Sequence, residues 1–331
     1  MVGDSAGTDI SIGHHNTMIG QGTGARTEHA SYNTFVGWFA GKENNATNSM
    51  TNANRNTYLG ARTGYINQNG EDNVGLGAFA DYNSESLSRT TFIGAYSEPD
   101  NNDVVSIGYS SRVSGQYGIA IGNESEVTGT NAIAIGYQAS NSVDNSVIIG
   151  NSSISSIGGP VNWTATSDGR FKTDVKENVI GLEFIDRLRP VTYNYDVKKL
   201  YADSGVLPEA LTSFITEKEK IRYSGFIAQE VEVVANEVNY DFSGVDAPQN
   251  EGDIYGLRYA EFIVPTVKAI QELHEKIKSL ETTIEEQRNQ LQTYQQMFSK
   301  LESRLAVLEK TKESKKENNM MDEYSIVLER D

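Results

Sequence analysis

Ser167 and Lys172 are the one pair of side chains in this sequence that could act as a nucleophile with its own base. They enclose the hexapeptide SDGRFK at 167–172. A serine hydroxyl beside a neutral lysine amine is a known catalytic arrangement, because the amine accepts the hydroxyl proton as the oxygen attacks. A lysine can act in this way only where desolvation or a nearby cation lowers its pKa. Since serine and lysine are common, the meaning of the pair depends on its surroundings.

Asp168 and Arg170 lie inside the same hexapeptide. Arg170 could lower the pKa of a neighbouring lysine, or it could hold Asp168 in an ion pair. We favour the ion pair, which gives both residues a structural role in support of the motif.

Composition limits the chemistry open to the rest of the chain. The protein has 45 acidic against 28 basic residues, a net charge of −17, and residues 1–166 contain only one lysine and five arginines. Phosphate contacts need lysine and arginine, so we expect no nucleic-acid partner. The absence of cysteine excludes disulfides and thiol chemistry. We expect no cofactor and no metal.

Neither a membrane span nor a secretory signal is visible in the sequence. No apolar run is long enough to cross a bilayer. The first five residues have neither a basic region nor an apolar region of the kind that a secretory signal needs. Because repeats begin near residue 10, we expect the whole protein to extend further towards its N-terminus.

An apolar residue followed by glycine recurs from residue 19 to residue 150. The intervals between the glycines are 17, 23, 17, 17, 14, 14, 14 and 14 residues. Early units read Asn-Thr-(Met/Phe/Tyr)-apolar-Gly, whereas later units read Gly-Ile-Ala-Ile-Gly or Ala-Ile-Ala-Ile-Gly. A short and regular period predicts a solenoid, in which each coil packs only on its neighbours.

Each repeat is expected to form a short strand of about five residues. In Ile133-Ala134-Ile135 the isoleucines share one face of the strand and the alanine takes the other. Glycine then ends the strand in a backbone conformation that other residues resist. A 14-residue coil has a thin core, so we expect a homotrimer in which the isoleucines of three chains share one core.

These repeats resemble two groups of fibrous proteins. The 14-residue units resemble the left-handed parallel β-roll in the heads of trimeric autotransporter adhesins such as YadA, chiefly over 104–150. The 17-residue units resemble repeats in phage tail fibres and bacterial surface proteins. The resemblance implies a trimeric shaft, for which we expect a host-surface glycan or protein receptor.

The shaft could cleave sugars or be purely structural. Tailspike glycosidases need two carboxylates across a sugar-binding groove. Five candidates are scattered over loops, and we favour solvated charge for them: Asp72, Asp81, Glu85, Asp100 and Asp103. Aromatic residues near the repeat glycines could stack on sugars, but packing on the next coil is favoured for them: Trp38, Phe39, Tyr58, Tyr65, Phe79, Tyr82, Phe92 and Tyr96.

His14 and His15 are the obvious candidates for a metal site on the shaft. Adjacent residues on a strand point to opposite faces, so one chain is not expected to supply both as ligands. A site on the threefold axis is the alternative.

Residues 151–166 form a linker rich in serine and glycine that leads directly to Ser167. Beyond it, four ordered stretches resemble the C-terminal intramolecular chaperone of phage endosialidases and tail fibres, a self-cleaving peptidase domain: Ser167–Lys172, Ile185–Tyr195, Gly225–Val231 and Leu257–Leu273. In that family three chains fold together and the bond before the serine is cut.

The resemblance implies a cut between Thr166 and Ser167, with Ser167 as nucleophile and Lys172 as base. The enzyme would act once on its own chain, as a single-turnover serine peptidase with no activity on other substrates. Gln229 and Glu230 lie in a matching stretch and could approach the scissile bond. Packing or capping is an equal alternative for both.

From residue 259 the sequence predicts a coiled coil. With Ile270 at position a, apolar residues follow a heptad repeat over six heptads, about 60 Å of helix. This heptad seam comprises Ile270, Leu273, Ile277, Leu280, Ile284, Gln287, Leu291, Tyr294, Phe298, Leu301, Leu305 and Leu308. Isoleucine at a with leucine at d favours two strands, but the shaft and the family favour three, so we expect a trimer.

The expected fold is therefore a mostly β repeat solenoid, a trimeric left-handed parallel β-roll, followed by an α+β chaperone domain that ends in a long trimeric coiled coil. The expected divisions are a shaft at 1–150, a linker at 151–166, the chaperone domain at 167–258, the coiled coil at 259–310 and a disordered tail at 311–331. Residues 198–222 form a polar insertion with no assigned role.

We expect a tail-fibre or adhesin-like protein on a virion tail or a bacterial cell surface. Its C-terminal domain would direct trimer assembly and then release itself. Two alternatives stay open: a trimerisation module that never cuts, and a glycan-binding or glycan-degrading tailspike.

Overall fold

The computed structural model describes residues 1–81, 83–204, 212–248 and 254–328. It divides into two compact units, one formed by Met1–Ala165 with Thr192–Tyr223 and the other by Thr166–Val191 with Ser224–Asp331. Tyr82, residues 205–211 of the polar insertion and residues 329–331 of the tail lie outside the described residues.

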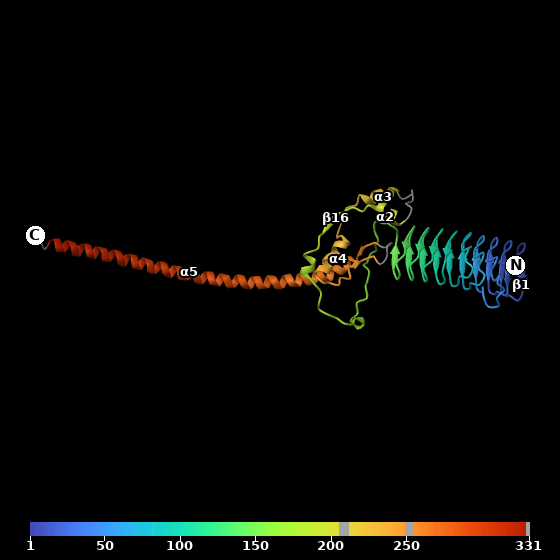
Figure 1. Cartoon of the computed structure of the whole chain (residues 1–331), viewed down its shortest axis with the longest axis horizontal. Coiled ribbons are helices and arrows are strands. Elements are labelled where there is room, and N and C mark those ends of the chain that lie inside the picture. The colour runs from blue at the N-terminus through green and yellow to red at the C-terminus, as the bar shows by residue number, and fades with distance from the viewer. Residues whose placement is uncertain (82, 205–211, 249–253, 329–331) are drawn as a thin grey trace. The chain divides into compact units, whose positions relative to one another are not determined.

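The first unit is a parallel β-solenoid whose strands stack one per coil (Figure 1). Within the described residues its larger sheet has nine parallel strands of three residues each. In chain order these are β2 (Thr17–Ile19), β4 (Thr34–Val36), β5 (Thr57–Leu59), β6 (Val74–Leu76), β7 (Thr91–Ile93), β9 (Val105–Ile107), β11 (Ile119–Ile121), β13 (Ile133–Ile135) and β15 (Val147–Ile149). The predicted solenoid is confirmed, with strands shorter than the expected five residues.

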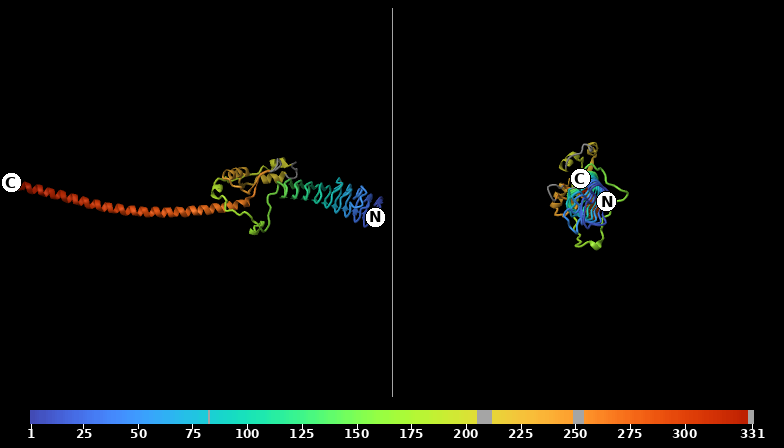
Figure 2. Two further views of the ribbon diagram at one scale, coloured as in Figure 1. Left: turned by 60° about the horizontal axis from the view of Figure 1, so that its bottom comes forward. Right: turned by 90° about the vertical axis from the view of Figure 1, so that its right-hand side faces the viewer.

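Smaller sheets accompany the nine-stranded one. The 14-residue coils add a second parallel sheet formed by β8 (Glu98–Pro99), β10 (Arg112–Val113), β12 (Glu126–Val127) and β14 (Ser140–Asn141). At the start of the shaft, β1 (Asp9–Ile10) pairs with β3 (Arg26–Glu28). Figure 2 shows the same stack from two further directions.

A ladder of asparagine side chains holds the longer coils in register. The side-chain Oδ1 of Asn16 accepts a hydrogen bond from the backbone N–H of Asn33, one coil further on. Asn33 does the same for Asn56, and Asn56 for Asn73. These side chains satisfy buried backbone donors that would otherwise be costly to leave unpaired. The hydrogen bond to the backbone of the next coil therefore explains why each Asn-Thr repeat carries an asparagine.

The glycine that follows each strand is required by the close stacking of coils. Gly122 has a φ of 144°. A Cβ atom on it would lie 2.1 Å from the carbonyl oxygen of Gly136 in the next coil. Both the backbone conformation and the space exclude other residues, as predicted from the repeat.

The middle residue of the strands before β15 is buried in the coil, and its neighbours are more exposed. Ala134 is fully buried, whereas Ile135 is 38% exposed. The outward residues form a continuous column because the register pairs Ile121 with Ile135 and Ile135 with Ile149. We call this column the apolar face; it comprises Ile19, Val36, Leu59, Leu76, Ile93, Ile107, Ile121, Ile135 and Ile149.

Asp81 interrupts the repeat inside the shaft. Asp81 takes the position that Gly41 and Gly64 occupy in earlier coils, since its backbone N–H donates to the next coil as theirs do. Its φ of 46° is also close to their values of 54° and 56°. The residue is 3% exposed. The pKa of the Asp81 carboxyl is raised to about 7, mainly by burial and in smaller part by the nearby Asp100 and Glu98, against the opposing effect of hydrogen bonds from Ser84.

This carboxyl is expected to make the stability of the shaft pH-dependent. Because its folded pKa lies above the unfolded value, its favourable contribution is complete below about pH 4 and is lost as the pH rises through about 7. Ionising it in the fold costs about 4 kcal/mol. Asp81→Asn should therefore raise the midpoint of thermal unfolding at about pH 8. Between about pH 5 and about pH 8, the midpoint of the variant should change less than that of wild type. Equal pH profiles for the two proteins, measured by scanning calorimetry, would contradict this.

The second unit has a compact core around one short helix. Phe184 of α1 (Leu182–Ile185) packs with Val231 of α4 (Ala228–Glu237), with Phe242, and with Phe262 of the 3₁₀ turn Tyr259–Phe262. Gly181 lies so close to the following helix that a Cβ atom would be 2.6 Å from the backbone nitrogen of Ala269. Small sheets pair β16 (Val191–Tyr193) with β17 (Tyr223–Gly225), and β18 (Val245–Asp246) with β19 (Gly256–Leu257).

Helix α5 spans Ile263–Leu328, and the polar insertion supplies α2 (Val197–Ser204) and α3 (Thr212–Glu219). The sequence predicts a disordered tail from residue 311. In the structure, α5 instead continues without a break to Leu328 (Figure 1). Residues 311–328 contain neither glycine nor proline, and lysine, glutamate and methionine favour helix.

In the insertion, Lys218 Nζ donates hydrogen bonds of 2.6 Å to the carbonyls of Ser152 and Ile154 in the linker.

Candidate functional site

A 3₁₀ turn at Gly169–Phe171 brings Ser167 and Lys172 together. Asp168 caps it: its carboxylate Oδ1 accepts a hydrogen bond of 2.9 Å from the Arg170 N–H. The Lys172 N–H donates to the carbonyl of Gly169 at 3.2 Å. The turn reverses the chain, so side chains five residues apart lie on the same side.

Lys172 Nζ donates a hydrogen bond of 2.8 Å to Ser167 Oγ. This distance is within the range that a nucleophile and its base require. Thr166, whose carbonyl precedes the serine, is exposed, as are both members of the pair. The geometry permits the hydroxyl proton to pass directly to the amine, provided that the amine is neutral.

Asp168 and Arg170 neutralise each other beside this pair. The Arg170 guanidinium donates to Asp168 Oδ2 from two nitrogens, at 2.6 and 3.0 Å. These bonds lower the pKa of the Asp168 carboxyl and raise that of the Arg170 guanidinium. The arginine therefore orders the turn through Asp168 and makes no hydrogen bond to Lys172 among those described.

Large apolar side chains near the pair in the sequence are uncovered in the single chain. Trp163 is 87% exposed and Phe171 is 76% exposed, and Val161 and Val175 are similarly open. Exposed apolar side chains gathered in one segment indicate a surface that another chain covers. The sequence contained part of this signal, since Val161 and Trp163 lie in a linker rich in serine and glycine.

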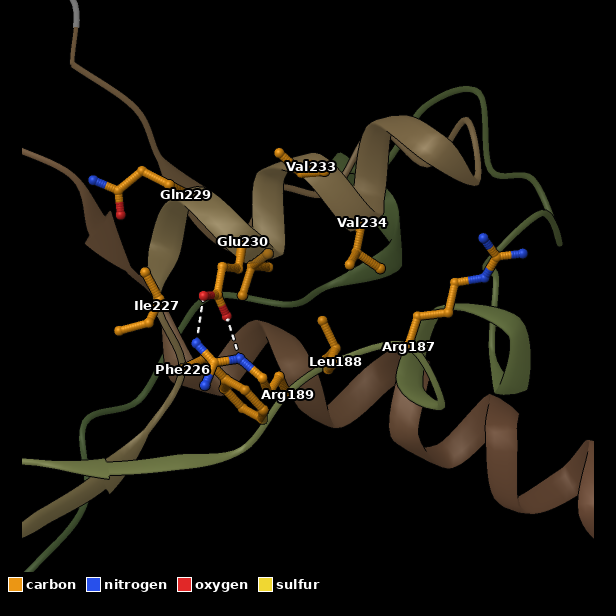
Figure 3. Close-up of a pocket in the computed structure, with 10 residues that line it drawn as sticks. Arg187, Leu188, Arg189, Phe226, Ile227, Gln229, Glu230, Val233 and Val234 are labelled. Carbon is orange, nitrogen blue, oxygen red and sulfur yellow. Dashed lines mark hydrogen bonds and ion pairs between the residues drawn. The ribbon is translucent and has the colours of Figure 1, made fainter.

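Glu230 takes part in an ion pair within the second unit. Its carboxylate bonds the Arg189 guanidinium, with one contact at 3.0 Å, and this joins the start of α4 to the segment before β16 (Figure 3). The pairing lowers the pKa of the Glu230 carboxyl. Gln229 is exposed and projects away from the pair (Figure 3). No described hydrogen bond joins either residue to Ser167 or Lys172.

The carboxylates weighed for sugar cleavage do not form a pair of free groups across a groove. Asp72 accepts hydrogen bonds from Arg55, Asp100 from Arg112, and Asp103 from Arg89. These side chains bridge neighbouring coils as ion pairs, which accounts for them structurally. Glu85 is exposed and Asp81 is buried.

The expected orientation of the histidines was wrong. The rings of His14 and His15 lie 4.7 Å apart, and His15 stacks on Tyr32 at 5.0 Å. His15 has a φ of 59°, so the two residues form a turn and do not alternate as in a strand. Within the described ranges, no cluster of three or more histidine or acidic side chains is placed to hold a metal ion.

Comparison with known protein families agrees with these observations. Residues 167–240 match the peptidase S74 family, described as the chaperone of endosialidase. The match begins at Ser167. We call residues 167–240 the endosialidase-chaperone segment. Residues 105–125 and 127–153 match the YadA head domain repeat, in two copies. No curated protein matches the chain.

The order of the two matches is the one expected from the sequence, with the repeats before the endosialidase-chaperone segment. Together they support a tail-fibre or adhesin-like trimeric protein. Leu257–Leu273, the fourth stretch of the resemblance, lies beyond the matched residues. In the part of the chain that the structure describes, none of the helices is apolar enough over sufficient length to cross a membrane.

Proposed function

We propose that this is a trimeric fibre protein whose C-terminal domain directs trimer assembly and then releases itself by cutting the Thr166–Ser167 bond. The observation that carries the proposal is the 2.8 Å hydrogen bond between Lys172 Nζ and Ser167 Oγ at the first residue of the endosialidase-chaperone segment. The mature product would be the shaft, on a virion tail or a bacterial cell surface, where it binds a host-surface receptor.

The cut follows from the position of the serine. Ser167 Oγ attacks the carbonyl carbon of Thr166 while the neutral Lys172 amine takes the hydroxyl proton. The C–N bond breaks, the proton passes to the Ser167 nitrogen, and the Thr166 acyl group is left as an ester on Ser167 Oγ. Water hydrolyses this ester to a carboxyl terminus at Thr166 and restores the serine hydroxyl. Each chain is cut once, because nucleophile and scissile bond share one chain.

The apolar face of the shaft supports trimer assembly. Leu59 is 45% exposed and Leu76 is 42% exposed, and both belong to a column of such residues along the nine-stranded sheet. A column of this kind is too apolar for a lone chain in water. Three copies about one axis would bury it, and closed threefold symmetry would leave no copy of the face exposed.

The heptad seam of α5 supports assembly at the other end. Ile270 is 60% exposed and Leu280 is 59% exposed in the single chain, and the rest of the seam is also open. A helix of this length with an uncovered apolar seam is stable in water when it packs against other helices. A trimeric coiled coil would cover the seam and bring three chains into contact.

Assembly and cutting are linked through exposure of the site. Ser167 and Lys172 lie in water in the single chain, and Trp163 and Phe171, near them in the sequence, are also uncovered. Removing an amine from water favours its neutral form, which is the form that can accept a proton. Packing of the neighbouring chains over these aromatic residues would therefore activate the pair only after the trimer has formed.

Removal of the domain gives the fibre its kinetic stability. Coils that resemble one another can pair in the wrong register, so a separate domain that aligns three chains is useful during folding. Once the shafts have closed, the cut removes the element from which separation would start. The released shaft is then held by a high barrier to unfolding.

Intact mass spectrometry combined with light scattering tests this proposal. We expect purified protein to give two fragments, residues 1–166 and 167–331, with the shaft fragment at three times its chain mass in solution. A trimer that stays whole during prolonged incubation would instead support a trimerisation module that never cuts. A cut monomer would remove the link between assembly and release.

A further inference from the structure

A cleft of about 420 Å³ opens on the shaft where the coils shorten from 17 to 14 residues. It is formed by successive corners of the solenoid, after β6, after β7 and after β9. Glu98 of β8 and Arg112 of β10 also line it, whereas no residue of the apolar face does. The proposed trimer contact and the cleft therefore use different residues.

Aromatic rings form one wall of the cleft. Phe79 stacks on Tyr96 with ring centroids 5.4 Å apart, and Tyr109 meets Tyr96 edge-on at 6.0 Å. Tyr96 is 48% exposed and Tyr109 is 50% exposed. The coil-to-coil packing expected for such residues is present, but it leaves about half of each tyrosine uncovered. Exposed rings of this kind give a flat apolar surface with a polar edge.

Two buried polar atoms in the cleft residues have no hydrogen-bond partner among the described residues: Asp81 Oδ1 and Ser97 Oγ. Asp81 is 3% exposed and Ser97 is 1% exposed, and both side chains line the cleft. A buried polar atom without a partner costs free energy, and such atoms gather where a ligand completes the bonding. Other shaft residues also carry such atoms, among them Asn33 and Gln138, but in this cleft two of them belong to residues that line one site.

The charge of the cleft is acidic. Asp81 and Glu98 contribute carboxyl groups, and the one basic side chain that lines it, Arg112, is paired with Asp100 at 2.9 Å. An anionic ligand would meet these carboxylates without a free cation to bind it. Neutral ligands with hydroxyl groups can donate to the carboxyl oxygens and pack their C–H surfaces on the rings.

We propose that this cleft binds a neutral saccharide, through Tyr96 and Tyr109 as the stacking surface and Asp81, Ser97 and Glu98 as hydrogen-bonding groups. This inference specifies the receptor role proposed for the shaft and does not depend on self-cleavage. Sialylated glycans, which carry a carboxylate, are disfavoured by the same charges.

Calorimetric titration of the uncut Ser167→Ala trimer tests the inference. The probes are neutral oligosaccharides of glucose, galactose and N-acetylglucosamine, with lactose and its sialylated form as a matched pair. We expect at least one neutral member to bind and the sialylated form to bind more weakly than lactose. Tyr109→Ala should weaken the binding by about tenfold or more, as expected for an aromatic anchor.

Tyr137→Ala is the matched control, since Tyr137 follows Gly136 as Tyr109 follows Gly108 and is also exposed. It should bind as the parent does. The inference is overturned if a trimer of correct mass binds no neutral member, if sialylation strengthens binding, or if both tyrosine variants lose affinity equally. Trimer mass, measured on each variant, separates these results from a failure of assembly, and the fragment masses of wild type report on cleavage independently.

Discussion

Ser167→Ala is expected to leave the chain whole while the trimer still forms. The substitution removes the Oγ atom that lies 2.8 Å from Lys172 Nζ, and no other hydroxyl takes its place in the turn. Loss of a nucleophile abolishes the covalent route and typically lowers such rates by about 10⁴-fold or more. Intact mass after overnight incubation should show one species for the variant and two fragments for wild type.

Lys172→Arg should have the same effect as Lys172→Ala. Arginine keeps the positive charge and can still donate a hydrogen bond, but it stays protonated at any usable pH and cannot act as a base. Lys176→Ala is the matched control: this lysine lies four residues further on and pairs with Asp174 at 2.7 Å. Wild-type cutting in either Lys172 variant would assign the base elsewhere, as would loss of cutting in Lys176→Ala alone.

The solenoid could be predicted because the residues that produce it recur along the sequence. The glycines after the strands recur in the sequence, and from Gly20 to Gly122 the structure gives them the same steric reason, the carbonyl group of the glycine in the next coil. The Asn-Thr units were visible as a pattern, but their role was not. Asn33 bonds the backbone of a residue 23 positions later, and sequence periodicity does not say which atom meets which.

The proximity of Ser167 and Lys172 needs only local structure, because a turn capped by Asp168 is a short-range effect. The Glu230–Arg189 ion pair was missed, since it joins residues 41 positions apart and depends on how α4 packs. Asp81 was treated as a solvated charge for the same reason. Asp81 stands where the earlier coils have Gly41 and Gly64, and its burial depends on the packing of the solenoid.

For the final part of helix α5, composition suggests less order than the structure shows. Its final third is highly charged, which suggested disorder, but it contains no helix breaker and follows directly from a strong heptad pattern. The seam residues are uncovered along the described helix, so its stability in the whole protein depends on partner helices.

Disrupting that seam is expected to abolish both assembly and cutting. In Ile277→Glu with Ile284→Glu, six carboxylates would have to be buried along the axis of a trimer. Burying an unpaired charge costs several kcal/mol, so each of the six would oppose assembly. We therefore expect a monomer by light scattering, in which the Thr166–Ser167 bond stays intact although Ser167 and Lys172 are unchanged.

Thr282→Glu with Thr293→Glu is the matched control, because it adds the same charge to positions f and c of the same helix, away from the seam. This variant should assemble and cut like wild type. If the seam variant remains trimeric, α5 is not the clamp. If it becomes monomeric and is still cut, the turn at 167–172 is sufficient for catalysis. Only a whole monomer beside a cut control trimer supports activation of the pair by neighbouring chains, since the residues of the pair are identical in both proteins.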